Sequence, residues 1–263
     1  MNAPLKPLRA TQRLQFHKGF TLDDAVPLVP YFARLGISHL YASPLLKARA
    51  GSMHGYDVVD PRVINPELGG EPALRRLVSA LRAQGMGLIL DIVSNHMAVG
   101  GADNPWWLDL LEWGRRSPYA DFFDIQWHSP DPLLEGQLLL PFLSSDYGTV
   151  LKAGEIPLRF DAGQGAFYVE HYQHYFPINP ATYAPLLNAA NDPELSELAQ
   201  RFAVLDHYPQ AYERARQARA ELATLAQQTG IQRAIDHGLK QFDSRTPEGF
   251  EQIGRASCRE RVS

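Results

Sequence analysis

Short apolar runs alternate with helical stripes along the first hundred residues of the chain. Runs with strand character occupy residues 11–16, 37–42 and 87–93. Between them, apolar side chains recur three and four residues apart, which places them on one face of a helix. The first stripe is Ala25, Leu28, Val29 and Phe32, and the second is Leu74, Leu77, Val78 and Leu81. Strand, helix, strand, helix, strand is the order typical of a parallel α/β fold.

Local signals mark where these helices begin, bend and end. Thr21 is a suitable N-cap for the first helix, and the two acidic residues that follow it favour the first turn. Pro27 and Pro30 predict a bend, because proline removes a backbone donor within a helix. Gly36 and Gly85 stand where the two helices are expected to end.

The run at residues 87–93 leads into polar side chains. Its apolar residues predict a strand buried on both faces, as in a parallel sheet. Asp91, Asn95 and His96 stand at its carboxyl end, where ligands bind in α/β folds. The alternative is a strand that simply stops in an Asn-containing turn.

After residue 96 the alternation stops. Residues 104–124 are aromatic and irregular, and residues 156–160 and 166–172 predict a hairpin across a glycine-containing turn. Asp192 caps a helix with Leu195, Leu198, Ala199 and Phe202 on one stripe, and residues 210–230 predict a long, largely solvated helix. Because no fourth parallel strand is expected before residue 252, we assign residues 97–252 to a separate subdomain.

Composition narrows the function classes. The 263 residues are 45% hydrophobic and 21% charged, as in a globular protein, and carry a net charge of −4 without a basic block, which argues against a nucleic-acid partner. No apolar run long enough for a membrane span and no secretory signal are found, so we expect a cytoplasmic protein without a membrane partner. We predict no metal, since no dense carboxylate cluster is present, and no cofactor.

The last eleven residues, 253–263, fit no element of the pattern. Most of this segment is what a common sequencing adapter encodes when it is translated. We therefore predict a non-native tail, which is excluded from fold reasoning; the alternative is a natural basic tail. Cys258, the only cysteine, lies in this tail. The rest of the chain therefore offers no disulfide framework, thiolate zinc site or cysteine nucleophile.

Three separated motifs carry a family resemblance. They are His54-Gly55-Tyr56-Asp57-Val58, Asn65-Pro66-Glu67-Leu68-Gly69-Gly70, and Asp91-x-x-x-Asn95-His96. Together they resemble the alpha-amylase clan, glycoside hydrolase family 13. Residues 13–20, 39–44 and 104–109 look like the maltooligosyltrehalose synthase family within that clan.

The resemblance implies a fold and an activity. The fold is a partial (β/α)₈ TIM barrel, with its first three βα units in residues 1–96 and a mostly helical subdomain inserted after the third strand. The activity is that of an isomerase of trehalose biosynthesis, a (1→4)-alpha-D-glucan 1-alpha-D-glucosylmutase. Such enzymes convert the reducing-end α-1,4 bond of a maltodextrin, the expected partner, to an α,α-1,1 bond by a retaining mechanism.

The resemblance also implies roles for particular residues. Tyr56 resembles the aromatic platform under the sugar at the cleavage point, and His96 the side chain that hydrogen-bonds that sugar. Asp91 and Asn95 resemble residues that orient the site. The alternatives are a core tyrosine and a structural histidine. His54 and Asp57 belong to the same substrate-binding set or only organise their loop. For Trp106 and Trp107 we favour a place in the core of the subdomain.

The family's catalytic carboxylates are missing from this sequence. In the family they follow later barrel strands, beginning with a G-x-R-x-D-type strand, and no such motif exists here. Asp124 and Asp206 lack that context, so we predict no catalytic residue and expect an inactive amino-terminal fragment. The alternatives are another amylase-clan hydrolase or transglucosylase, or a catalytically dead module that binds α-glucans.

Overall fold

The computed structural model describes residues 7–132, 134–207 and 210–252. The chain divides into two compact units, Met1–Val99 and Gly100–Ser263, whereas the boundary expected from the sequence lay between residues 96 and 97. The expected tail at residues 253–263 lies outside the described residues. Among the described residues, no helix has the length and apolar character needed to span a membrane.

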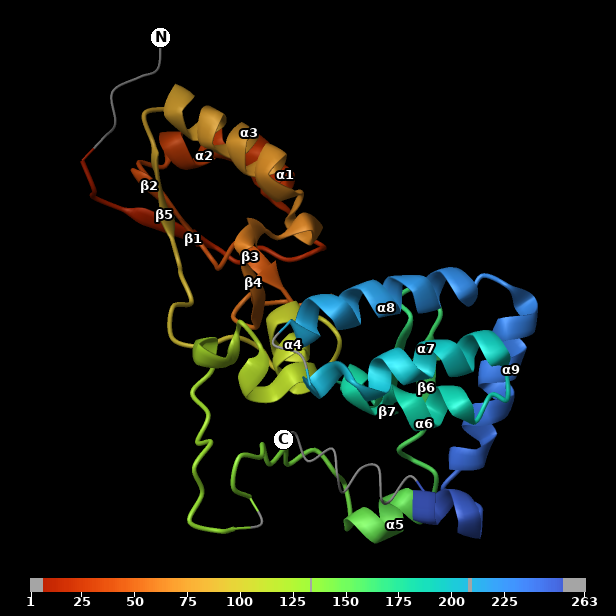
Figure 1. Ribbon diagram of the computed structural model, residues 1–263. Coiled ribbons are helices and arrows are strands. Elements are labelled where there is room, and N and C mark those ends of the chain that lie inside the picture. Colours follow the sequence, from red (N-terminus) through yellow and green to blue (C-terminus); the bar gives the residue numbers. More distant parts are fainter. Residues whose placement is uncertain (1–6, 133, 208–209, 253–263) are drawn as a thin grey trace. The chain divides into compact units, whose positions relative to one another are not determined.

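Unit 1 is built on a parallel three-stranded sheet. Its order is β1-β2-β5, from β1 (Thr11–Leu14), β2 (His39–Ala42) and β5 (Gly87–Leu90). Three helices, α1 (Leu22–Ala25), α2 (Val29–Arg34) and α3 (Gly70–Ala83), connect the strands and cover one face of the sheet (Figure 1). The predicted order of strands and helices and the α/β class are therefore confirmed.

The predicted cap and bend are both present in the first connection. The backbone N–H and the hydroxyl of Thr21 both donate to Asp24 Oδ2, at 2.7 and 2.8 Å. A 3₁₀ turn, η1 (Val26–Leu28), separates α1 from α2; Pro27 lies in this turn and Pro30 in the first turn of α2. A second 3₁₀ turn, η2 (Pro66–Leu68), precedes α3, and Asn65 caps it by accepting from the N–H of Glu67 at 3.0 Å.

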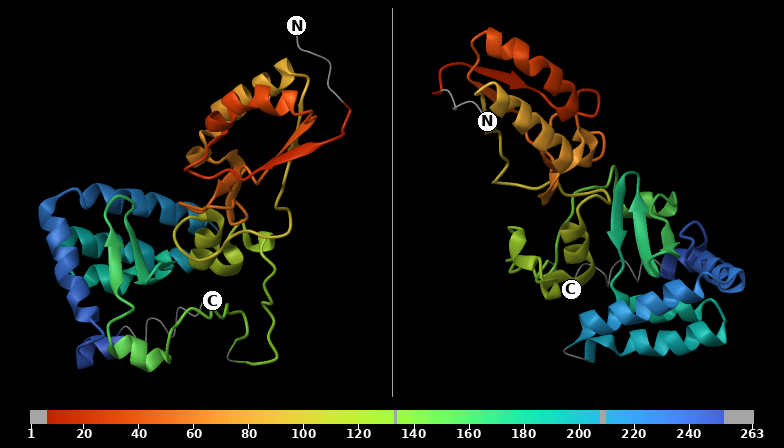
Figure 2. Two further views of the ribbon diagram at one scale, coloured as in Figure 1. Left: turned by 180° about the vertical axis from the view of Figure 1, so that it is seen from behind. Right: turned by 90° about the horizontal axis from the view of Figure 1, so that it is seen from above.

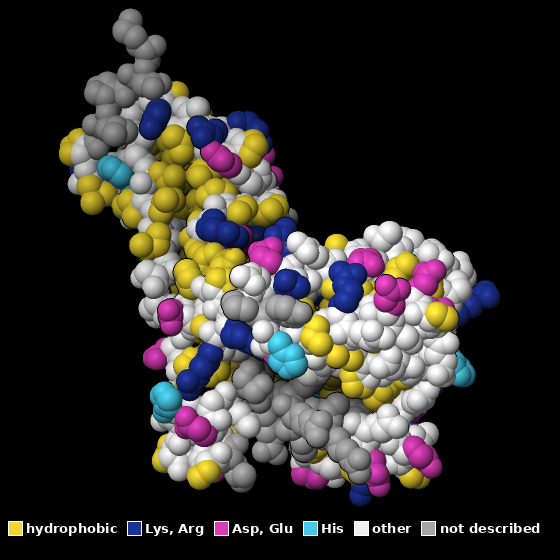
Figure 3. Space-filling view, in the orientation of Figure 1, with side chains coloured by type: hydrophobic (Ala, Val, Ile, Leu, Met, Phe, Trp, Pro, Cys, Tyr) yellow, Lys and Arg dark blue, Asp and Glu magenta, His cyan; other side chains and the backbone are white. Residues whose placement is uncertain are grey.

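The expectation that the third strand is buried on both faces was wrong. Leu90 is 48% exposed and Ile92 is 68% exposed. The physical reason is that β5 lies at an edge of the sheet, where β2 is its only strand partner among the described residues. Hydrophobic side chains are correspondingly visible on the surface of unit 1 (Figure 3).

A hairpin that the sequence did not predict follows β2. No strand was expected between residues 42 and 87, but β3 (Leu46–Ala48) pairs antiparallel with β4 (Val58–Ile64). The sequence pattern of this hairpin is weak because β3 has three residues, the register shifts twice, and Pro61 lies inside β4. The loop between these strands carries the His54–Asp57 motif, so the hairpin positions part of the candidate site.

Unit 2 contains an antiparallel sheet of three strands. β6 (Leu158–Asp161) and β7 (Ala166–His171) form the predicted hairpin, and β8 (His174–Pro177) adds a strand that was not predicted. The turn before β8 contains Tyr172 at φ 52°. This left-handed conformation is uncommon for a residue other than glycine, so the sequence did not indicate a turn there. The sheet lies against helices of the same unit (Figure 2).

Helices supply most of the core of unit 2. They are α4 (Pro105–Trp113), α5 (Tyr147–Lys152), α6 (Tyr183–Asn188), α7 (Pro193–Ala203), α8 (Ala211–Leu225) and α9 (Thr229–Leu239). The 3₁₀ turns are η3 (Gly114–Arg116), η4 (Ala120–Phe122), η5 (Pro180–Thr182), η6 (Leu205–His207) and η7 (Lys240–Phe242). The stripe predicted on α7 is fully buried.

The long helix expected at residues 210–230 is shorter and less solvated than predicted. It ends at Leu225, and a separate helix begins at Thr229. Its inner face buries an alanine-rich stripe of Ala211, Ala215, Ala218 and Leu222. Small side chains of this kind carry little hydropathy signal, which explains why the sequence suggested a solvated helix.

Candidate functional site

The side chains of Arg13, Tyr41 and Asp91 lie together at the carboxyl ends of the parallel strands of unit 1. Arg13 on β1 is in register with Tyr41 on β2, and Tyr41 is in register with Ile89 on β5. Because successive side chains alternate between the faces of a strand, Asp91 shares the face of Ile89. The N–H of Asp91 donates to the carbonyl of Ala42 at 3.0 Å, which continues the pairing past the end of β5.

Asp91 is the centre of this group. Its Oδ2 accepts hydrogen bonds from the hydroxyls of Tyr56 at 2.5 Å and Tyr41 at 3.2 Å, and lies 3.6 Å from Arg13 Nη2. Arg13 Nη2 also donates to the Tyr56 hydroxyl at 3.1 Å, and its guanidinium lies 5.5 Å from the centroid of the Tyr41 ring. We call Arg13, Tyr41, Tyr56 and Asp91 the Asp91 cluster.

The electrostatics of the cluster raise the pKa of Tyr56. Its hydrogen bond to Asp91 raises the pKa of the Tyr56 hydroxyl above its ordinary value, and the opposing effect of Arg13 is smaller. The hydrogen bond with Tyr56 also raises the pKa of Arg13. The Tyr56 hydroxyl donates its hydrogen to Asp91, and this contact fixes the direction of the phenol ring.

The loop between β3 and β4 holds Tyr56 in place. His54 Nδ1 accepts from the backbone N–H of Tyr56 at 3.0 Å and lies 3.8 Å from Asp57 Oδ1. The hydroxyl of Ser52 donates to Asp57 Oδ1 at 2.5 Å. His54 and Asp57 thus organise the loop, which was one of the two alternatives that the sequence offered. A direct contact of either residue with a substrate stays a prediction.

His96 and Tyr56 lie close together, although Tyr56 lies in the loop of the β3–β4 hairpin and His96 follows β5 of the parallel sheet. His96 Nε2 is 3.0 Å from the backbone carbonyl oxygen of Tyr56. Both side chains are exposed, Tyr56 by 37%, so the alternative of a core tyrosine is wrong. Asn95 is also exposed, but among the described residues no hydrogen bond joins its side chain to the Asp91 cluster.

Sequence reasoning missed two members of the cluster, Arg13 and Tyr41. Each alternates along its strand with a residue of the apolar core, Leu14 on β1 and Leu40 on β2. The alternation therefore contained a signal, since the polar partners of core residues must point to the opposite face.

The aromatic residues of unit 2 fill its core. Trp106 is 9% and Trp107 is 7% exposed, which confirms the place in the core that was favoured for them. Asp206 is an exposed partner of Arg116 at 2.7 Å, and Asp124 is exposed. In the described ranges, no group of three His, Cys, Asp or Glu residues is arranged to hold a metal ion.

The comparison with protein families bears on this arrangement of parallel strands with polar residues at their ends. A family model described as alpha amylase, catalytic domain, matches residues 22–177. The chain belongs to the alpha-amylase family.

The chain is similar to curated relatives that are named as a maltooligosyl trehalose synthase and as amylases. The putative maltooligosyl trehalose synthase of Mycobacterium tuberculosis is 45% identical over 186 residues, which are 64% of this chain and 24% of the relative. The intracellular maltogenic amylase of Bacillus subtilis is 36% identical over 107 residues, 41% of this chain and 17% of that protein. The chain thus spans about a quarter or less of the length of these relatives.

Solved structures of maltooligosyltrehalose synthases are also similar to this chain. The maltooligosyltrehalose synthase from Arthrobacter ramosus is 42% identical and superposes with a TM-score of 0.56, over 66% of this chain and 21% of that one. Another solved maltooligosyl trehalose synthase is 39% identical with a TM-score of 0.60, over 65% of this chain and 22% of that one. The resemblance to this family that the sequence motifs indicated is therefore confirmed.

Proposed function

We propose that the chain contributes the first part of the catalytic barrel of an enzyme that isomerises the reducing end of maltodextrins. The reaction converts the last α-1,4 bond to an α,α-1,1 bond by intramolecular transfer. The observation that carries this proposal is the 45% identity over 186 residues with the mycobacterial protein named a putative maltooligosyl trehalose synthase. The similarity to the maltogenic amylase is both lower and shorter.

In this proposal, residues 1–96 form the first three βα units and residues 97–252 form a subdomain inserted after the third strand. The parallel order β1-β2-β5 supports the first assignment. The antiparallel sheet and helices of unit 2, in which no parallel strand pair is found among the described residues, support the second.

Tyr56 acts as the platform under the sugar at the cleavage point. An aromatic ring stacks well on the apolar face of a sugar only if its orientation is fixed. The hydrogen bonds from Arg13 and to Asp91 fix it at the hydroxyl end, while 37% of the residue stays exposed for the ligand. In this role Asp91 supports the platform and does not attack the sugar.

His96 offers one ring nitrogen to the sugar. A carbonyl oxygen can only accept, so the contact with the Tyr56 carbonyl places the hydrogen of a neutral imidazole on Nε2. Nδ1 is then an acceptor for a sugar hydroxyl. Such a contact strengthens as positive charge develops on the sugar ring, which favours the transition state over the bound substrate. Asn95 completes the set as a support at the same strand end.

None of Tyr56, Asp91, Asn95 and His96 makes or breaks a covalent bond in this proposal. In a retaining mechanism one carboxylate attacks the anomeric carbon and a carboxylic acid protonates the leaving oxygen. A hydroxyl of the released glucose then attacks the glycosyl-enzyme in place of water. Because this chain lacks the G-x-R-x-D motif, we expect it to bind sugar without turnover on its own.

The products formed from maltopentaose test this function. The experiment uses an enzyme of the relatives' length that carries these residues, and follows reducing ends and free glucose together. Isomerisation removes reducing ends and releases little glucose. The second candidate, a hydrolase, is favoured by the similarity to the maltogenic amylase and would increase reducing ends. A protein that binds maltopentaose but changes neither quantity would be a catalytically dead binding module.

A further inference from the structure

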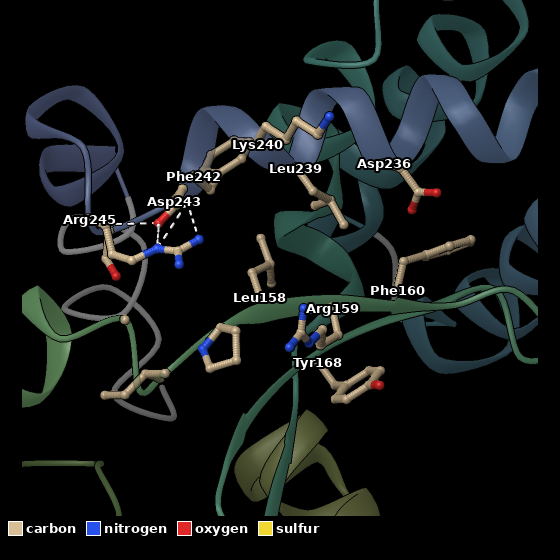
Figure 4. A pocket seen from close by; sticks show the side chains of 14 residues that line it. Leu158, Arg159, Phe160, Tyr168, Asp236, Leu239, Lys240, Phe242, Asp243 and Arg245 are labelled. Carbon is tan, nitrogen blue, oxygen red and sulfur yellow. Dashed lines mark hydrogen bonds and ion pairs between the residues drawn. The ribbon is translucent and has the colours of Figure 1, made fainter.

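Unit 2 contains a cavity of about 460 Å³. It lies between β6 and the segment that joins the end of α9 to η7 and the residues after it (Figure 4). β6 is an edge strand of its sheet, with β7 on one side, so its other side is open to this space. The volume lies within the range of roughly 300–1,000 Å³ that is usual for small-molecule sites.

One wall of the cavity is apolar. Leu158 extends from β6 and Leu239 from α9 into the space between the two elements (Figure 4). Phe160, Phe242 and Tyr168 also line the cavity. This surface suits the C–H face of a ligand that also carries polar groups.

Most of the charge at the cavity is already neutralised within the protein. Arg245 donates to Asp243 through Nε at 2.9 Å and Nη2 at 2.6 Å, and these hydrogen bonds lower the pKa of Asp243 to about 2. Arg159 pairs with Glu170 at 2.9 Å. Two lining residues, Asp236 and Lys240, have no ion-pair partner among the described residues, and they carry opposite charges.

This balance favours an uncharged ligand. An anionic ligand would meet the carboxylate of Asp236, and a cationic ligand would meet the ammonium of Lys240. A ligand rich in hydroxyl groups can instead donate to Asp236 and accept from Lys240.

Ser244 adds a buried polar group to the cavity. The residue is 6% exposed and lines the space, and no hydrogen bond from another described residue engages its hydroxyl. A hydroxyl that no protein group engages is free to bond to a ligand. Ser244 can donate and accept, as the hydroxyl groups of a sugar can.

We propose that this cavity is a sugar-binding site for a short α-glucan segment. The choice of an α-glucan rests on the proposed function, because that function supplies the substrate class. Polar contacts come from Asp236, Lys240 and Ser244, and the apolar contact comes from the wall formed by Leu158 and Leu239. The site holds the glucan without any bond being made or broken.

Equilibrium dialysis of the chain against radiolabelled maltotriose tests the proposal, because it reports bound sugar per chain whatever the oligomeric state. Asp236→Ala and Lys240→Ala are each expected to weaken binding about tenfold, as for the loss of a hydrogen bond to a charged group. Glu197→Ala and Arg233→Ala, which remove exposed charges outside the cavity, should leave it unchanged.

Tyr56→Ala separates this inference from the proposed function. Binding at the cavity survives this variant, which lies in unit 1. If Tyr56→Ala abolishes binding while Asp236→Ala does not, the cavity is not a sugar site and the proposed function stands. Radiolabelled alanine is the probe for a zwitterionic ligand, and its binding in place of maltotriose overturns the proposal.

Hydrogen exchange of the unaltered chain tests the proposal without a substitution that could disturb folding. Maltotriose is expected to slow amide exchange in residues 154–160 and 236–245. Unchanged exchange in both segments at a maltotriose concentration that saturates dialysis would overturn the proposal.

Discussion

The hydroxyl of Tyr56 donates a 2.5 Å hydrogen bond to Asp91, a residue 35 positions further along the chain. This bond joins the loop of the β3–β4 hairpin to the end of the last parallel strand of unit 1. It fixes an exposed aromatic ring at the strand ends where amylase-family chemistry is expected. The function of the ring and the function of the carboxylate are therefore linked.

Removing only the hydroxyl tests that link. In an enzyme of the relatives' length, Tyr56→Phe is expected to lower kcat/KM about tenfold, because the ring loses the contacts that orient it. Tyr31→Phe is the matched control, since Tyr31 is an exposed tyrosine on α2. Equal activity of the two variants would show that the hydroxyl does not position the ring.

Gly55 gives a second test of the same loop through its backbone. It has φ +76°, and a Cβ there would lie 2.7 Å from the carbonyl oxygen of Pro44. Gly55→Ala is expected to displace Tyr56 and lower kcat/KM by at least tenfold. Gly36→Ala shares a positive φ of +90° but meets no atom within 4 Å, so it controls for backbone strain. Similar losses in the two variants would contradict the prediction.

Glu112 predicts a pH dependence for the stability of unit 2. Burial raises its pKa from 4.5 to about 6, although Arg219 pairs with it at 2.8 Å. Between these pH values the folded state binds more protons than the unfolded state, so stability falls as pH rises from about 4.5 through 6. The expected loss is about 2 kcal/mol, and Glu112→Gln should abolish it.

Urea unfolding followed by tryptophan fluorescence measures this effect in unit 2 alone, because all four tryptophans lie after residue 99. Glu197→Gln, an exposed carboxylate, should keep the pH profile of the unaltered chain. A difference between unaltered chain and Glu112→Gln that stays constant from pH 4.5 to 6.5 would refute the assignment.

The edge of β5 that pairs with no described strand predicts self-association of the chain. An exposed strand edge offers unpaired donors and acceptors, and Leu90 and Ile92 add exposed apolar surface beside it. We expect sedimentation to show oligomers or aggregates, and Ile92→Lys to reduce them. Leu139→Lys changes a similarly exposed residue of unit 2 and should not. A stable monomer with one cooperative thermal transition would contradict this expectation.

Local signals in the sequence predicted the parts of the fold that depend on neighbouring residues. The cap at Thr21, the bend at the prolines and the stripe on α7 each follow from side chains within one turn or two. Pairing is different, because an apolar run does not reveal how many strands will flank it. That is why the burial of β5 was overestimated and the three-residue strand β3 was missed.

The candidate site was predicted in the same uneven way. Tyr56, Asp91 and His96 were found because they belong to family motifs. Arg13 and Tyr41 were missed because their role depends on the register of three strands that are far apart in sequence. Asn95 belongs to a motif, but the structure does not bring its side chain into the Asp91 cluster.

The kinetics of His96→Ala in an enzyme of the relatives' length test the central claim, that the strand ends of unit 1 hold the sugar at the bond that breaks. A contact that strengthens with transition-state charge contributes to turnover more than to binding. The account predicts that kcat for maltopentaose falls on the order of 10²-fold while KM changes little. An unchanged kcat with a raised KM would contradict it, because His96 would then only hold the substrate.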